Sequence, residues 1–363
     1  MKRNLVYLFI LLLCSCSSHP SLAQQPEEET PEKAPEQPTE EKSDEATDLS
    51  GQPVGFATTG ITPTGGEGGK HITVTSATEL ANALKKPEKL TVYIKGTIKV
   101  DNVISVQASN KTLLGLPGSI LTNPNRTKDT SGILYFKSGS DNLILRNLTF
   151  KSAGAYDTDG RDNLCIDGTT NIWVDHCDFQ DGVDGNFDCK NASDHIAVTW
   201  CRFRYLIEPM AGGSGGSNDH RFSNLWGNSD SHTQDRERLN TTFQYCWWDE
   251  GCRDRMPRVR FGKVHIANCL YSSTATSGCI GVGYEADVYV EKSVFTNIKK
   301  PHKVYDESGQ IRFDGCSFHN STVDKGTENS FTPPYILEAI PLEEVENTVR
   351  THSGATLNIK ETD

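Results

Sequence analysis

The sequence lacks any apolar run that reaches the ~20 residues of a membrane-spanning helix. Its most apolar segment, residues 5–13, follows Lys2 and Arg3, and this order is typical of a secretory signal. The sequence also lacks a P-loop, a Rossmann glycine pattern and an HExxH motif, which excludes three common enzyme classes. Positive charge is scarce, because 36 Lys and Arg stand against 48 Asp and Glu and the net charge is −12. We therefore expect no nucleic-acid partner.

The first fifty residues predict export. Cys16 ends a lipobox-like stretch at 13–16 and would carry a lipid anchor, whereas a small-x-small site ending at Ala23 is the alternative for an ordinary signal peptidase. We favour the lipoprotein, because a long polar tether rich in Pro and Glu follows. The predicted parts are a signal peptide at 1–23, a disordered acidic linker at 24–52 and one domain at 53–363. We expect a monomer, secreted or held at the cell surface or outer membrane, with membrane contact only through Cys16.

Aromatic residues recur at a regular spacing after short β-branched alternations. They stand at positions 150, 179, 203, 248, 271, 295 and 318, with intervals of 29, 24, 45, 23, 24 and 23. The period is 23–24 residues, with one long insertion between 203 and 248. A unit this short has no helix to cover a sheet, so it buries its apolar face only by coiling and stacking on the next unit. The repeat therefore predicts an all-β parallel β-helix with coils ~4.8 Å apart.

Most cysteines follow the same period. Those at 177, 201, 246, 269 and 316 share one repeat position, which favours reduced thiols that face the core. Cys165 and Cys189 lie twelve residues before two of them, on another face of the coils. A disulfide framework is the alternative for an exported protein. In that case Cys252 and Cys279, which lie outside this ladder of equivalent repeat positions, are the expected pair.

The segment 75–87 predicts a short helix before the repeats. Leu80 and Leu84 have helical spacing, and Glu79 follows a start rich in Ser and Thr. One amphipathic helix of this kind can cover the open end of a coil stack.

Acidic residues gather in two clusters. One has acids at 157, 159 and 162, and the other contains Asp184 and Asp188. Side chains alternate along a strand, so Asp184 and Asp188 would share a face that Asp162 could join from a neighbouring coil. Three converging carboxylates suit Ca²⁺, which takes hard oxygen ligands. Solvated turns are the alternative, because Asp and Gly also populate them.

Arginines crowd a third segment, and a glycine-rich stretch forms a fourth. Arg258 and Arg260 would share a strand face, and Arg255 lies just before Pro257. Guanidinium groups this close repel one another unless they bind an anion. The planar guanidinium can donate two parallel hydrogen bonds to one carboxylate. A surface patch paired with nearby acids is the alternative. The segment 212–222 falls inside the long insertion and predicts a mobile loop, where substrate contacts often lie.

Four stretches together resemble a known family. Residues 171–179, 181–188, 227–236 and 255–265 read NIWVDHCDF, DGVDGNFD, GNSDSHTQDR and RMPRVRFGKVH. They resemble the pectate lyases of polysaccharide lyase family 1, and the resemblance covers residues 53–320. It implies a right-handed parallel β-helix that cleaves polygalacturonate by β-elimination with Ca²⁺ as cofactor.

The resemblance also implies roles for single residues. It matches Asp162, Asp184 and Asp188 to calcium ligands, Arg255 to the catalytic base, and Arg260, with Arg258 beside it, to substrate binding. A base must be an uncharged guanidine, against the rule that arginine stays protonated, so neighbouring cations would have to favour the neutral form.

The chain departs from the family pattern at two places. A further family acid falls at Gly160, so that ligand is absent or supplied by Asp159. The family's substrate-binding lysine is also absent, with Glu208 and Phe222 near its place, and we predict Arg221 as the substitute. Two alternatives remain, a pectin lyase that needs no calcium and a non-catalytic glycan-binding β-helix. The presence of Asp162, Asp184 and Asp188 argues against a pectin lyase. The presence of Arg255 and Arg260 argues against a non-catalytic protein.

Overall fold

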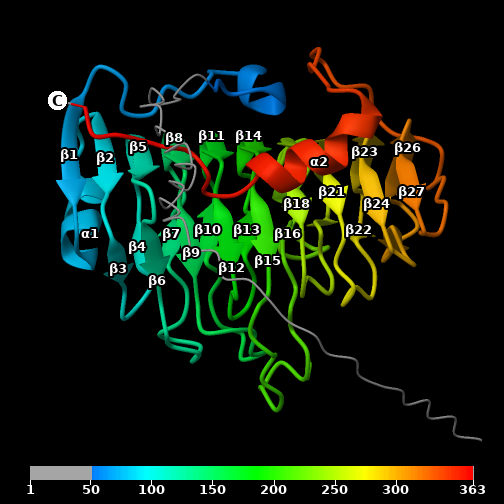
Figure 1. The fold of residues 1–363 in the computed structure, drawn as a ribbon, viewed down its shortest axis with the longest axis horizontal. Helices are drawn as coiled ribbons and strands as arrows, with labels where there is room; N and C mark the ends of the chain where they lie inside the picture. Colours follow the sequence, from blue (N-terminus) through cyan, green and yellow to red (C-terminus); the bar gives the residue numbers. More distant parts are fainter. Residues whose placement is uncertain (1–50, 363) are drawn as a thin grey trace, which may run out of the picture. The chain divides into compact units, whose positions relative to one another are not determined.

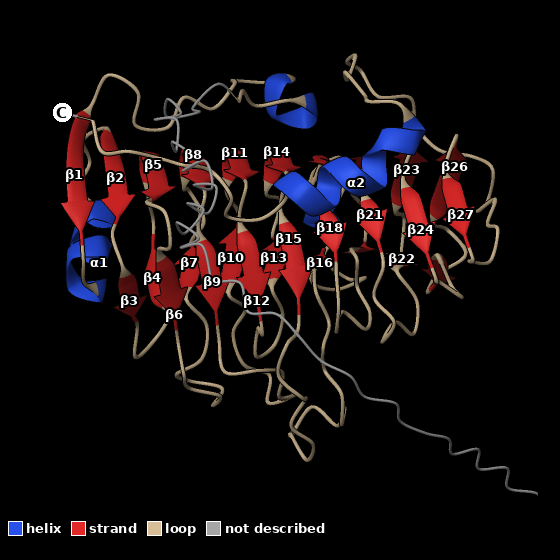
Figure 2. Cartoon of the chain, in the orientation of Figure 1, coloured by secondary structure: helices blue, strands red, loops and turns tan. Residues whose placement is uncertain are grey.

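The computed structural model describes residues 51–362 and shows a parallel β-helix made of three sheets (Figure 1 and Figure 2). Successive coils contribute strands to the three sheets in turn, and each strand pairs in parallel with its equivalent in the next coil, as between Ile172 and Ile196. The predicted signal peptide, Cys16 and the linker up to residue 50 lie outside the described residues. Within the described part, no helix combines the length and apolar character needed to cross a membrane.

The strands fall into three sets. The ten-stranded sheet contains β1 (Lys70–Val74), β2 (Leu90–Ile94), β5 (Ser109–Gly115), β8 (Asp141–Arg146), β11 (Thr170–Asp175), β14 (Asp194–Thr199), β17 (Thr241–Gln244), β20 (Lys263–Ala267), β23 (Asp287–Glu291) and β26 (Gln310–Asp314). The eight-stranded sheet contains β4 (Ile104–Val106), β7 (Leu134–Phe136), β10 (Leu164–Asp167), β13 (Phe187–Lys190), β16 (Leu225–Trp226), β19 (Arg258–Val259), β22 (Ile280–Val282) and β25 (His302–Val304). The nine-stranded sheet contains β3 (Thr97–Lys99), β6 (Ile120–Thr122), β9 (Thr149–Lys151), β12 (Asp178–Gln180), β15 (Arg202–Arg204), β18 (Trp247–Trp248), β21 (Leu270–Tyr271), β24 (Val294–Thr296) and β27 (Ser317–His319).

The aromatic repeat is an inward stack of rings. The centroids of Phe150 and Phe179 are 4.8 Å apart, and those of Phe179 and Phe203 are 5.2 Å apart. The stack continues through Trp248, Tyr271, Phe295 and Phe318. These separations match the normal distance between paired strands, so one period of the sequence is one coil. The predicted β-helix is confirmed.

The cysteine ladder is confirmed, and the alternative disulfide framework is wrong. All nine cysteines among the described residues are free. Cys252 and Cys279 lie in the core, where the Cys252 thiol donates to the Phe203 carbonyl oxygen at 3.2 Å instead of bonding to a second sulfur. Cys165 pairs with Asp188 across β10 and β13, so it shares the outward face with that carboxylate.

The predicted N-terminal helix is α1 (Ala77–Lys85). Ser76 and Glu79 form a capping box, which satisfies free N–H groups of the first turn. Leu80, Ala83 and Leu84 are buried in the main core. The helix therefore covers the first coils as expected.

The C-terminal segment, whose position the sequence left open, lies along the stack rather than over its end. It contains α2 (Leu342–His352), which crosses in front of β18 and β21 in Figure 1. Val345 and Val349 pack with Trp247, Leu270 and Val294 on the outer face of the nine-stranded sheet. The segment after α2 then runs back toward β1 (Figure 1).

The long insertion consists of two loops around one short strand. Residues 205–224 connect β15 to β16, and residues 227–240, with the 3₁₀ turn η2 (Thr233–Asp235), connect β16 to β17. A second 3₁₀ turn, η1 (Gly55–Thr58), packs on β14 and β17. The coil is therefore complete despite the 45-residue interval.

Candidate active site and metal site

The predicted calcium ligands and the predicted base surround one depression on the outer face of the eight-stranded sheet. Asp162 precedes β10, Asp184 precedes β13, and Asp188 lies within β13. All three line a depression of about 280 Å³ together with Arg255. The other lining residues are Lys128, Asp129, Tyr135, Asp159, Gly160, Arg161, Lys190, Leu225 and Asn228.

Parallel stacking brings the three acids together. The Asn163 N–H donates to the Gly185 carbonyl oxygen at 3.1 Å, and this bond places residue 162 beside the segment 184–188. Phe187 and Cys189 both belong to the core, so Asp188 between them points outward. The acids thus converge from two adjacent coils as predicted, but Asp184 does so from the turn before β13 and not by strand alternation.

The carboxylates of this depression are crowded. Burial and the nearby charge of Asp184 raise the pKa of Asp188 to about 7. Burial, with the charges of Asp188 and Asp184, also raises the pKa of Asp162 well above its ordinary value. Asp162 Oδ1 is buried and accepts no hydrogen bond from any described residue. Buried acids in this state are unfavourable unless a cation compensates them.

Gly185 leaves a small space between these oxygens. A Cβ on Gly185 would lie 2.8 Å from Asp162 Oδ1, 3.1 Å from Asp188 Oδ1 and 3.5 Å from the Phe222 carbonyl oxygen. Its three nearest neighbours are therefore all oxygens, which is the ligand type that Ca²⁺ prefers. The residues present fit a Ca²⁺ ion held by Asp162 and Asp188, with Asp184 beside them.

A second group of polar residues joins this site and was missed by the sequence reasoning. His220 Nε2 lies 3.1 Å from Asp184 Oδ1, and His220 Nδ1 lies 3.3 Å from Asp157 Oδ1. His220 is only 6% exposed although it comes from the glycine-rich insertion. Asp159, the alternative fourth ligand, pairs with Lys128, and its side chain is 75% exposed.

Arg255 reaches the depression from the turn before β19. Its backbone is in the left-handed region, with φ of 57°, and its N–H donates to Asp254 Oδ1 at 2.7 Å. Its guanidinium carbon lies 4.7 Å from the ring centre of Phe222. Phe222 thus supports the predicted base from the insertion that the sequence marked only as a mobile loop.

Of the two other arginines of the same segment, Arg258 begins β19 and Arg260 directly follows that strand. Arg258 stacks on Tyr305 at 3.9 Å, and burial together with the charge of Arg260 lowers the pKa of Arg258. Arg260 is buried, donates to the Gly227 carbonyl oxygen at 2.9 Å and pairs with Asp230. Within residues 51–362, neither side chain lines the depression. Their substrate roles stay predictions.

Other cations border the acids more closely than Arg221 does. Arg221 donates from Nε and Nη2 to Asp219, both at 2.7 Å, and it does not belong to the described lining. Lys190 and Arg161 do line the depression and flank Tyr135, each 5.4 Å from its ring centre. Lys190 stands two residues after Asp188 on β13, so strand alternation was the signal that could have identified it.

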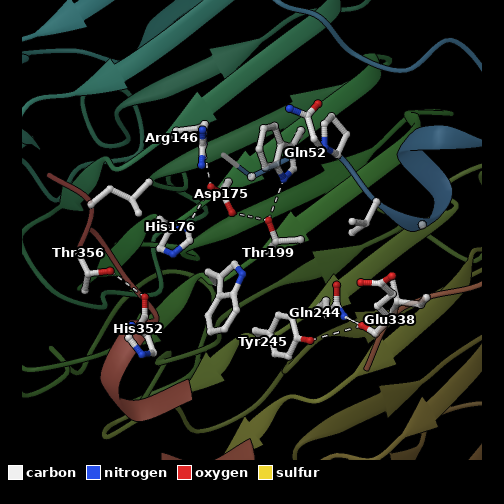
Figure 3. Close-up of a pocket in the computed structure, with 18 of the residues that line it drawn as sticks. Gln52, Arg146, Asp175, His176, Thr199, Gln244, Tyr245, Glu338, His352 and Thr356 are labelled. Carbon is white, nitrogen blue, oxygen red and sulfur yellow. Dashed lines mark hydrogen bonds and ion pairs between the residues drawn. The ribbon is translucent and has the colours of Figure 1, made fainter. Parts of the chain in front are cut away.

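A larger cavity of about 920 Å³ lies over the ten-stranded sheet, bordered by segments 51–58 and 336–358 (Figure 3). On its floor, Arg146 Nε donates to Asp175 Oδ2 at 2.8 Å and the Thr199 hydroxyl donates to Asp175 Oδ1 at 2.6 Å. The opposite charges of this floor compensate one another. The smaller depression differs, because burial and crowding raise the pKa values of Asp162 and Asp188 there and Arg255 lines the same space.

Comparisons with known proteins bear on the family and the fold. A family model of pectate lyases matches residues 43–334. The chain is 30% identical over 319 residues to probable pectate lyase B of Aspergillus terreus, covering 84% of this chain and 89% of that protein. It is 29% identical over 315 residues to the pectate trisaccharide-lyase of Bacillus licheniformis, covering 83% and 85% of the two chains. The crystal structure of pectate lyase Bsp165PelA from Bacillus sp. N165 in complex with trigalacturonate has a TM-score of 0.66 at 19% identity, covering 83% of this chain and 98% of that one.

Proposed function

This chain belongs to the pectate lyase family, and on that premise we propose that it cleaves polygalacturonate by calcium-dependent β-elimination at the acidic depression. One observation carries the assignment to this place. The oxygens of Asp162 and Asp188 border one small space at Gly185, and Arg255 lines the same depression. Acids that hold Ca²⁺ and a group that takes a proton are the two parts this reaction needs.

The chemistry follows from the positions of these residues. When bound, Ca²⁺ supplies positive charge that neutralises a galacturonate carboxylate and acidifies the proton on the adjacent C5. A guanidine nitrogen of Arg255 takes the C5 proton, and the C5 electron pair forms the C4–C5 double bond. The C4–O4 bond breaks, the departing oxygen receives a proton from water, and the new chain end is an unsaturated sugar.

The cations of the depression support an acidic polymer. Lys190 and Arg161 border the acids from β13 and from the turn before β10, while Arg255 borders them from the turn before β19. Each can meet a uronate carboxylate, since guanidinium and ammonium groups both bind carboxylates strongly when water is partly excluded. Arg258 and Arg260 would extend these contacts along the same sheet, and Arg221 would do so only after leaving Asp219.

The direct test uses the purified full chain and polygalacturonate. The expected result is a rise in ultraviolet absorbance from the unsaturated product with Ca²⁺ and none with chelator. Absence of product under both conditions would sink the lyase proposal, and product that survives chelation would point to pectin-lyase chemistry. A non-catalytic glycan binder would instead retain polygalacturonate on an affinity gel without releasing product.

We also propose that the enzyme acts outside the cell as a monomer, anchored through Cys16 or released. The support is the signal-like segment at 1–23. Cell fractionation of the wild-type chain and of Cys16→Ala tests the anchor. Equal release of both proteins from the membrane fraction would argue against lipidation.

A further inference from the structure

The insertion between β15 and β16 reaches two parts of the proposed active site at once. It carries His220 and Phe222, whose ring centres are 4.3 Å apart. His220 contacts Asp184 on the metal side, and Phe222 contacts Arg255 on the proton-transfer side. Asp184 precedes β13 and Arg255 precedes β19, so these parts are two coils apart in the stack.

The histidine half of this pair is held between two carboxylates. Its nitrogens lie 3.1 Å from Asp184 Oδ1 and 3.3 Å from Asp157 Oδ1. Asp157 also fixes the loop itself, because it accepts the Ser217 N–H at Oδ2 (2.7 Å) and the Gly215 N–H at its carbonyl oxygen (2.8 Å). His220 thus lies within ion-pair distance of both carboxylates, and neither of its buried ring nitrogens forms a hydrogen bond with a described residue.

The phenylalanine half is held by its backbone. The Tyr205 hydroxyl donates to the Phe222 carbonyl oxygen at 2.7 Å, and Phe222 forms a parallel bridge with Asp254, the residue before Arg255. Its ring lies 4.7 Å from the Arg255 guanidinium carbon, a cation–π contact. The same carbonyl oxygen borders the space at Gly185. Phe222 thus faces both the predicted base and the metal-binding space.

We propose that His220 and Phe222 are a pair of positioning residues that fix the metal ligand Asp184 and the base Arg255 relative to each other. This inference rests on the proposed lyase function. Positioning of this kind matters because a displacement of about 1 Å at a reacting group can lower a rate by about 100-fold.

The two halves predict different losses. Phe222→Leu keeps an apolar side chain but removes the ring under Arg255, so kcat should fall about 10-fold or more while KM and calcium affinity change less than about 2-fold. Phe222→Tyr keeps the ring and should restore kcat. His220→Ala removes the partner of Asp184, and calorimetry should show calcium affinity reduced about 10-fold. His220→Gln keeps one donor and should recover part of that affinity.

A control and a fold check accompany these variants. Ser214→Ala changes an exposed position of the same loop and should leave both readouts at wild-type values. Thermal melting identifies any unfolded variant, and then Phe222→Tyr and His220→Gln supply the comparison. Wild-type kcat in Phe222→Leu, or wild-type calcium affinity in His220→Ala, would overturn the inference. If the wild-type chain releases no product but its calcium affinity falls in His220→Ala, the lyase proposal is refuted while the metal half of the pair is supported.

Discussion

The small space at Gly185 permits a sharp test of the metal site, the substitution Gly185→Ala. The new methyl group would lie 2.8 Å from Asp162 Oδ1 and 3.1 Å from Asp188 Oδ1, closer than ordinary van der Waals contact. The backbone at Gly185 lies outside the left-handed region, so alanine itself is not strained there. The backbone therefore accepts alanine, and the cost in the folded apoprotein is the rotation of a carboxylate away from the new methyl group.

We expect the calcium affinity of Gly185→Ala to fall instead. At least one carboxylate has to rotate away from the space, and a displaced ligand costs about 10- to 100-fold in affinity, or about 1.4–2.8 kcal/mol. Calorimetric titration with Ca²⁺ measures the affinity, and melting in chelator measures the stability of the apoprotein. Gly160→Ala is the matched control, since Gly160 lines the same depression but its Cβ would meet the Ser131 hydroxyl rather than a carboxylate. Equal calcium affinity in wild type and Gly185→Ala would refute the assignment of the ion to this space.

Three further predictions concern charge. Arg255→Ala should abolish product formation while calcium affinity stays within about 2-fold, because the base is not a metal ligand; retained turnover would refute the base. In chelator, stability should fall as pH rises from about 4 to about 7, since the Asp188 carboxyl has a folded pKa of about 7, above its unfolded value of about 3.9, and the native state binds more protons in that window. The melting temperature gained from Ca²⁺ should grow across the same window, and a gain independent of pH would contradict this. Asp175→Ala should lower the free energy of unfolding by about 3–5 kcal/mol, because it removes a buried carboxylate that accepts hydrogen bonds from Arg146 and Thr199; chemical denaturation checks it.

The repeat was readable from the sequence because its signal is local and periodic. The ring stack through Phe150, Phe179 and Phe203 follows directly from the aromatic spacing, and one coil equals one period. The helix α1 was equally readable, since its cap and its buried leucines lie within ten residues. The expected pairing of Cys252 with Cys279 had weaker support. Both residues lie outside the repeat position that the other cysteines share, and this alone does not determine where a thiol points.

The three acids were readable for a related reason. Strand alternation turns Asp188 outward, Asp184 lies in the turn just before β13, and the family resemblance identified Asp162 as their partner from the adjacent coil. Lys190 obeys the same alternation and was nevertheless overlooked. Arg221 illustrates the limit of nearness in sequence, because its guanidinium is committed to Asp219 and not to the depression.

The sequence by itself therefore determined the coil, the end cap and the acids, because each depends on spacing within one or two repeats. Tertiary structure alone decided how the insertion folds back. It brought His220 to Asp184 and Phe222 under Arg255, contacts that depend on coils distant in the chain and carry no period. A loop outside the repeat has no register to follow, so its conformation is set by the partners that it meets, here Asp157 and Tyr205.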